Sequence, residues 1–115
     1  MKLALAAATL AVALAVPAAF AATPTLNGTV GPGFSITLTK GGKKVTKLTA
    51  GTYLFKIADK SSAHDFHLKG PGGVNKTTKV GGLSSATWKL TLKKGTYSYV
   101  CDPHSSFMHG SFTVS

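Results

Sequence analysis

Apolar and polar residues alternate with a period of two along most of the chain. Gly and Pro clusters separate the alternating segments, which are short and evenly spaced. The clearest segments are residues 34–40 (FSITLTK), 52–58 (TYLFKIA), 64–69 (HDFHLK), 86–92 (ATWKLTL), 96–101 (TYSYVC) and 111–115 (SFTVS). Strands of this length, with turn residues between them, are typical of an all-β sandwich or barrel. No segment shows the period of an amphipathic helix.

The same alternation divides residues 64–69 into two faces, because successive side chains of a strand point in opposite directions. His64 shares a face with two large apolar residues, whereas Asp65 and His67 share the other face with a lysine. We therefore predict that His64 faces the core and that Asp65 and His67 face solvent. By the same parity, Cys101 shares a buried face with two tyrosines.

Residues 1–21 do not belong to this pattern. Lys2 precedes an apolar run from Leu3 to Val16, and small residues follow up to Ala21. This layout is typical of a secretory signal, so we expect cleavage after Ala21 and a single domain over residues 22–115. The alternative is an uncleaved membrane anchor, since the apolar run is nearly long enough to span a bilayer. We expect a periplasmic or secreted protein with no stable membrane insertion after cleavage.

The charge is one-sided. The chain has 13 Lys and Arg residues, all of them Lys, against 3 acidic residues, all of them Asp, and its net charge is +10. A nucleic-acid partner is disfavoured because base and phosphate recognition draws on the forked guanidinium of Arg. Two interpretations stay open. The lysines keep strand edges soluble and unpaired, or their field attracts acidic redox partners or anionic envelope surfaces.

One cysteine excludes an internal disulfide, yet this cysteine lies among other metal-binding residue types. In YVCDPHSSFMHG (99–110), Cys101, His104 and Met108 bring a thiolate, an imidazole and a thioether within eight residues. A second imidazole from His64 would complete a His₂Cys set with a weak axial Met, which is typical of blue-copper electron-transfer sites. The alternatives are His67 in place of His64, Met108 as core filler, and a plain buried thiol.

Other chemistries explain these residues less well. Zinc accepts Cys and His, but a thioether is not among its usual ligands, so Met108 would be left without a role. A catalytic Cys–His pair needs a positioned acid or an oxyanion device, and the sequence shows neither. No second His-rich cluster is present for a multicopper oxidase. We therefore expect a copper protein that is not an enzyme.

Two segments together resemble the cupredoxins, the group of plastocyanin, pseudoazurin and amicyanin. They are GTYSYVCDPHSSFMHGSFTV (95–114) and AHDFHLKGPGG (63–73). The resemblance implies a monomeric Greek-key β-sandwich of seven or eight strands that carries single electrons between redox partner proteins. It also implies one type 1 copper, bound by His64, Cys101, His104 and Met108.

The resemblance further implies an apolar docking patch around the second histidine ligand. Its residues would be Pro103, His104, Phe107 and Pro71. The same fold could instead capture and deliver copper outside the cytoplasm, or serve as a metal-free β-sandwich module. These two functions remain alternatives to electron transfer.

Two residues depart from the cupredoxin pattern. Asp65 stands where an Asn usually follows the first histidine ligand, and Asp102 stands where Ser or Thr often follows the cysteine. An ionised Asp accepts hydrogen bonds but cannot donate them. Two ionised carboxylates near the metal would favour Cu(II) and lower the reduction potential.

Overall fold

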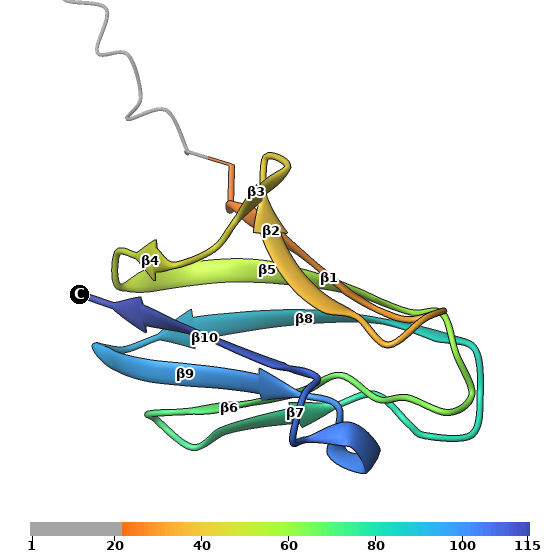
Figure 1. Ribbon diagram of the computed structural model, residues 1–115. Coiled ribbons are helices and arrows are strands. Elements are labelled where there is room, and N and C mark those ends of the chain that lie inside the picture. Colours follow the sequence, from red (N-terminus) through yellow and green to blue (C-terminus); the bar gives the residue numbers. More distant parts are fainter. Residues whose placement is uncertain (1–21) are drawn as a thin grey trace, which may run out of the picture.

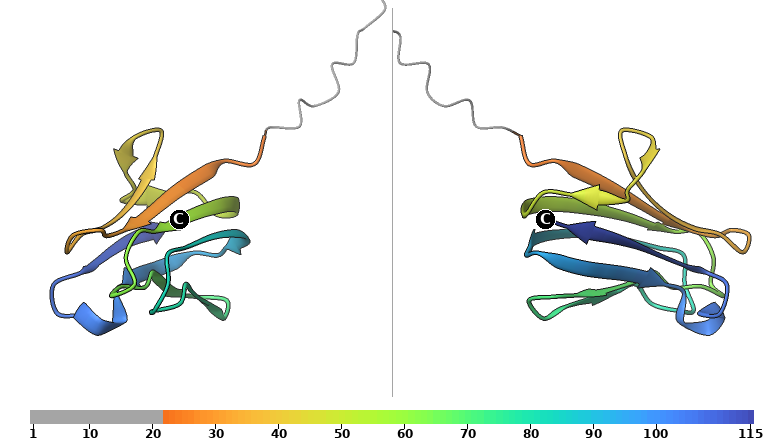
Figure 2. Two further views of the ribbon diagram at one scale, coloured as in Figure 1. Left: turned by 90° about the vertical axis from the view of Figure 1, so that its right-hand side faces the viewer. Right: turned by 60° about the vertical axis from the view of Figure 1, so that its left-hand side comes forward.

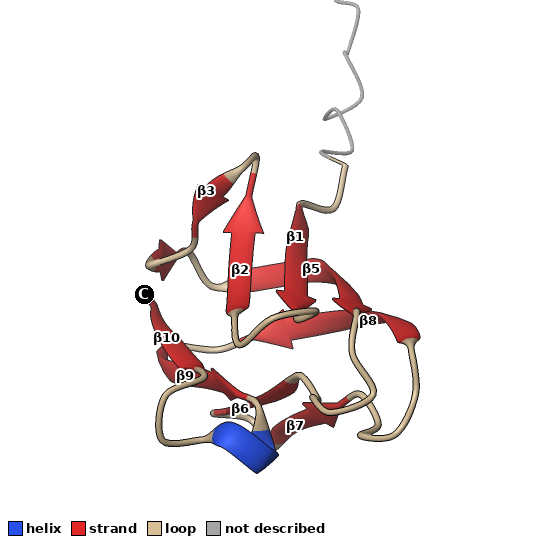
Figure 3. Ribbon diagram, turned by 45° about the vertical axis from the view of Figure 1, so that its right-hand side comes forward, coloured by secondary structure: helices blue, strands red, loops and turns tan. Residues whose placement is uncertain are grey.

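The computed structural model describes residues 22–115, and the predicted leader lies outside the described residues. Two five-stranded sheets face each other (Figure 1), and a 3₁₀ turn, η1 (Asp102–His104), is the only helical element of the described part (Figure 3). The first sheet has the order β3-β2-β1-β5-β8 and the second has the order β4-β10-β9-β6-β7. The strands are β1 (Thr25–Val30), β2 (Ile36–Lys40), β3 (Lys43–Lys44), β4 (Lys47–Leu48), β5 (Gly51–Asp59), β6 (His67–Gly70), β7 (Val74–Thr77), β8 (Ser84–Leu92), β9 (Gly95–Val100) and β10 (His109–Val114).

The predicted all-β sandwich is confirmed. Two of the ten strands, β3 and β4, have only two residues each, and the other eight match the expected strand number. The segments predicted as strands all contribute to a sheet, although residues 64–66 lie outside β6. Within the described residues, no helix is long and apolar enough to cross a membrane.

The alternating pattern failed to indicate β1 and β7. β1 contains Gly28, a residue type that is depleted in strands. It is needed here because a Cβ at this position would meet Ile57 and approach a ring carbon of Phe66 at 3.0 Å. β7 is a short edge strand whose side chains are mostly exposed, so no apolar face marks it in the sequence.

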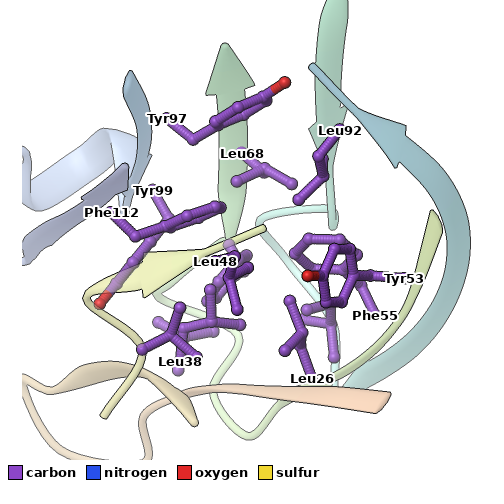
Figure 4. Close-up of a cluster of buried hydrophobic side chains, with 14 of the residues drawn as sticks. Leu26, Leu38, Leu48, Tyr53, Phe55, Leu68, Leu92, Tyr97, Tyr99 and Phe112 are labelled. Atoms are coloured by element: carbon purple, nitrogen blue, oxygen red, sulfur yellow. The ribbon is translucent and has the colours of Figure 1, made fainter. Parts of the chain in front are cut away.

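The core lies between the two sheets and is rich in aromatic rings (Figure 4). Tyr99 stacks on Phe66 with ring centroids 5.4 Å apart, and Tyr97 stacks on Phe112 at 5.3 Å. As parity predicted for β9, both tyrosines and Cys101 are buried. These stacks fix β9 against β10 and against the segment that leads into β6.

Four loops gather at one end of the sandwich, which we call the site end. They follow β1, β5, β7 and β9 and cover residues 31–35, 60–66, 78–83 and 101–108. Two views show η1 and the β1–β2 loop on the same side of the molecule (Figure 2). In the first sheet, Val30 pairs with Asp59 and Asp59 with Ser84, which brings the loops next to these residues to the site end. In the second sheet, the pairing of His67 with Val100 brings the loops before β6 and after β9 to the same end.

Candidate metal centre

Three of the predicted ligands converge at the site end. Nδ1 of His64 lies 3.1 Å from Nδ1 of His104, and Sγ of Cys101 lies 3.6 Å and 3.5 Å from these two nitrogens. A triangle with these three sides has its centre about 2.0 Å from every corner, close to the roughly 2.0–2.3 Å of metal–nitrogen and metal–sulfur bonds. The three atoms therefore frame a space of the size that one metal ion needs.

The β9–β10 loop supplies two of these atoms and also carries Met108. The His104 N–H donates to the Cys101 carbonyl at 3.0 Å, and the Met108 N–H donates to the His104 carbonyl at 2.9 Å. The loop closes on itself where the Cys101 N–H donates to the Met108 carbonyl at 3.0 Å. Met108 is 1% exposed and belongs to the same buried cluster as Cys101. The backbone thus holds the three residues in one tight loop.

His64 comes from a different part of the chain and is not on a strand. β6 begins only at His67, and the loop over residues 60–66 leads into it. Thr78 holds this loop: its hydroxyl accepts from the Phe66 N–H at 2.8 Å and donates to the Asp59 carboxylate at 3.0 Å. The same carboxylate accepts from the Ser61 N–H at 3.2 Å. A buried hydrogen-bond network therefore positions His64 in place of a strand ladder.

Gly31 allows this loop to approach. A Cβ on Gly31 would lie 3.1 Å from Cδ2 of His64 and 2.9 Å from Cβ of Ser61, and its φ of +73° is in the left-handed region that favours glycine. The imidazole of His64 is consequently packed against backbone on one side and is 2% exposed.

The prediction that Asp65 faces solvent was wrong. Asp65 is 3% exposed, and its Oδ1 accepts from the Asp102 N–H at 2.6 Å. Parity failed because residues 64–66 do not have strand geometry. The bond joins the residue after His64 to the residue after Cys101, so it ties the two ligand-bearing loops together. An acceptor is sufficient for this contact, which explains how Asp can occupy the position of the usual Asn.

His67 is more constrained than the predicted solvated side chain. Its Nδ1 lies 2.8 Å from the Asp102 carboxylate and its Nε2 lies 2.6 Å from Oδ1 of Asn75. Asp65, His67 and Asp102 could offer a second group of cation ligands, with ligand atoms within 4.8 Å of one another. Both ring nitrogens of His67 already have partners, however. We interpret the group as a hydrogen-bonded cluster that supports the loop after Cys101.

Burial sets the electrostatics of the centre. It raises the pKa of the Cys101 thiol, and the N–H groups of Asp65 and His104 partly offset this rise. Burial, together with a hydrogen bond to the Asp102 carboxyl, raises the pKa of Asp65. The Asp65 side chain and then His67 lower the pKa of Asp102. The negative charge of this pair therefore concentrates on Asp102, the more exposed carboxylate.

Two exposed phenylalanines flank His104. Phe34 is 69% exposed and Phe107 is 58% exposed, and their ring centroids lie 5.2 Å and 5.5 Å from that of His104. Sequence reasoning included Phe107 but missed Phe34, which reaches the site from the β1–β2 loop. It wrongly included Pro71, which lies at the opposite end, where its carbonyl accepts from the Tyr97 hydroxyl at 3.3 Å.

Several solved structures share this architecture. The copper protein rusticyanin matches with a TM-score of 0.59 and 21% identity over 81% of this chain and 78% of that one. Dithionite-reduced auracyanin from Roseiflexus castenholzii matches with a TM-score of 0.57 and 19% identity, covering 81% and 98% of the two chains. Rusticyanin from Thiobacillus ferrooxidans matches with a TM-score of 0.55 and 23% identity, covering 81% of this chain and 77% of that one. Identities this low establish the fold alone.

A family model is more specific, although no curated protein matches the chain. The model matching residues 35–115 describes copper binding proteins of the plastocyanin/azurin family. These residues contain His64, Cys101, His104 and Met108, an arrangement typical of a type 1 copper site. With its family resemblance, its β-sandwich and its copper-type donor set in agreement, the chain belongs to the plastocyanin/azurin family of copper binding proteins.

Proposed function

We propose that this protein is an exported electron carrier, in which His64, Cys101, His104 and Met108 would together bind one copper ion. The preformed triangle of donor atoms carries the proposal. Bound copper would supply a one-electron couple between Cu(I) and Cu(II). A thiolate and a thioether suit the reduced ion, and imidazoles suit the oxidised ion. One fixed ligand set can therefore serve both states with little movement.

Burial supports a carrier over a protein that captures copper and delivers it. Cys101 is 0% exposed and His64 is 2% exposed, so an acceptor protein has no direct access to either ligand. Both sit on loops held by buried hydrogen bonds, and the ligand positions do not depend on a flexible segment. Such a rigid site is suited to exchanging electrons and poorly suited to releasing its ion.

The partially exposed His104 is the route by which an electron would reach the surface. Phe34 and Phe107 surround it with exposed aromatic area, and Val80 and Leu83 add exposed apolar side chains on the β7–β8 loop at the same end. Apolar and aromatic side chains form the cores of protein interfaces. Redox partners are expected to dock here through an apolar surface of their own.

The first test is a titration of residues 22–115 with Cu(II). An intense thiolate-to-copper absorption band in the visible should appear and saturate at one equivalent. Cys101→Ser should abolish the band, and His64→Gln or His104→Gln should change or abolish it. His109→Gln is the matched control, because His109 is exposed and outside the triangle. A band that persists without the Cys101 sulfur would refute the proposed site.

Electron exchange needs a separate test. Reversible voltammetry and fast electron self-exchange would support a carrier, whereas slow redox kinetics with ready Cu(I) transfer to a chelator would favour delivery. Phe34→Ser and Phe107→Ser should slow exchange without altering the copper band. A metal-free module predicts no rise in melting temperature with copper, but a ligand that binds only the folded state must raise it.

A further inference from the structure

The lysines are concentrated at the end of the sandwich that lies opposite the copper ligands. Six of them belong to the β2–β3 hairpin, β4 and the β8–β9 turn. They are Lys40, Lys43, Lys44, Lys47, Lys93 and Lys94, which we call the lysine pole. All six are exposed. β4, the β8–β9 turn and the end of β10 lie on the left in Figure 1, opposite η1.

Strand pairing and packing connect these lysines. Val114 pairs with Leu48 on one side and with Gly95 on the other, which places Lys47 and Lys94 at the same end of the second sheet. A shallow cavity of about 290 Å³ joins Lys40 to Lys47 and to the end of β10. Lys93 extends its side chain toward the β6–β7 turn, where its Cδ would lie 3.4 Å from a Cβ on Gly72.

Acidic and apolar groups lie at the opposite end. The three carboxylates of the sequence, those of Asp59, Asp65 and Asp102, are all at the site end. The large apolar side chains that are exposed in the described residues also lie there, in the loops after β1, β7 and β9. The lysine pole contains no acidic side chain within the described residues. The site end also carries Lys60 and Lys79, so lysines are not confined to the pole. The pole has six lysines and no acidic side chain, however, whereas the site end carries the carboxylates and the exposed apolar groups.

This separation argues against an acidic redox partner on the lysine pole. A partner bound there would sit at the far side of the sandwich from His104, where electrons are expected to leave. The pole also lacks exposed large apolar side chains of the kind that form the core of a protein interface. Lysines without Arg provide mobile point charges and no planar clamp for individual phosphates. Diffuse attraction to an extended anionic surface fits these properties better.

We propose that the lysine pole docks the protein reversibly on a membrane surface rich in anionic phospholipid headgroups. A lysine close to such a surface strengthens binding by roughly fivefold, and its effect fades within a Debye length. Docking through this end turns His104 and its aromatic neighbours away from the bilayer. A copper carrier held in this way diffuses along the membrane with its exchange surface open to partners.

Vesicle binding tests the proposal and can be measured without copper, so it is independent of the proposed electron transfer. Residues 22–115 contain all the strands and the core that the structure describes, and this segment is the protein to use. One variant replaces four pole lysines: Lys43→Gln, Lys47→Gln, Lys93→Gln and Lys94→Gln. A second variant makes the same charge change on strands outside the pole: Lys56→Gln, Lys69→Gln, Lys76→Gln and Lys89→Gln. Equal melting temperatures would show that both variants fold.

The unmodified domain should sediment with vesicles that contain phosphatidylglycerol and not with pure phosphatidylcholine vesicles. At about 0.1 M salt, where the Debye length is about 10 Å, the pole variant should lose affinity by roughly several hundredfold, about fivefold for each of its four lysines. The strand variant should lose tenfold or less. Equal losses in the two variants, or no binding by the unmodified domain, would overturn the proposal. Tighter binding to soluble polyphosphate than to vesicles would also overturn the proposal, because the lysine pole would then bind an anionic polymer and not a membrane.

Orientation gives a second measurement. Spin-labelled lipid should broaden the backbone amide signals of Lys43 and Lys94 in the NMR spectrum of vesicle-bound protein. The signals of Phe34 and Phe107 should remain sharp. Broadening of the phenylalanine signals alone would show that the apolar end inserts into the membrane, which contradicts docking through the lysines.

Discussion

Thr78 is expected to control the stability of the loop that carries His64. Thr78 is only 6% exposed, and its hydroxyl bridges the Phe66 N–H and the Asp59 carboxylate. Valine has nearly the same shape and cannot make either bond. Thr78→Val would therefore leave a buried donor and a buried acceptor unsatisfied, with little change in packing.

The size of the effect follows from these two bonds. An unsatisfied buried group costs about 1–3 kcal/mol, so the two groups together cost about 2–6 kcal/mol. Asp59 retains its bond from the Ser61 N–H, which favours the lower half of this range. A domain of ordinary stability has about 5–15 kcal/mol in total. The substitution should remove a large part of the free energy of unfolding.

Urea denaturation of the metal-free domain would measure this change as a lower midpoint with an unchanged slope. Thr78→Ser, which keeps the hydroxyl, should restore most of the loss. Thr91→Val is the matched control, because the Thr91 hydroxyl contacts Thr52 at 2.9 Å on an exposed surface. Its effect should stay within about 0.5 kcal/mol. If Thr78→Val cost no more than Thr91→Val, the network would not hold the loop.

Three further substitutions test other contacts of the centre. Asp65→Ala should cost about 1–3 kcal/mol in unfolding free energy, because the Asp102 N–H loses its acceptor, whereas Asp65→Asn keeps an acceptor and should be milder. Asp102→Asn should raise the reduction potential of the copper-loaded protein in voltammetry, since it removes negative charge near the metal; a lower potential would contradict the assigned charge. Gly110→Ala should lower the melting temperature, because its methyl would meet the Tyr99 ring, while Gly33→Ala, with open space around it, should not.

The strands were predictable because their information is local. In β2, β5, β8, β9 and β10, alternate side chains face the core, so apolar residues recur at every second position. Gly28 concealed β1, since the reason for glycine there is a close approach by Phe66 and Ile57 from elsewhere in the chain. Packing between distant segments leaves no periodic signal in a single sequence.

The same distinction applies to the site. Cys101, His104 and Met108 lie in one compact loop, so their spacing could be recognised in the sequence. The residues that pack around this loop could not be predicted in the same way. Asp65 was assigned to solvent because the strand period was extended into a segment held by side-chain hydrogen bonds. Phe34 reaches His104 from 70 positions earlier in the chain, a contact that only the fold reveals.

The separation of His64 from Cys101 by 37 positions has a consequence for how the protein acquires its metal. In an unfolded chain the Cys101–Met108 fragment lies far from His64, which would join it only when the sheets close over the core. Tight metal binding is thus delayed until folding is complete. A chain that crosses a membrane unfolded would travel empty and would be loaded at its destination, where copper binding then holds the folded state closed.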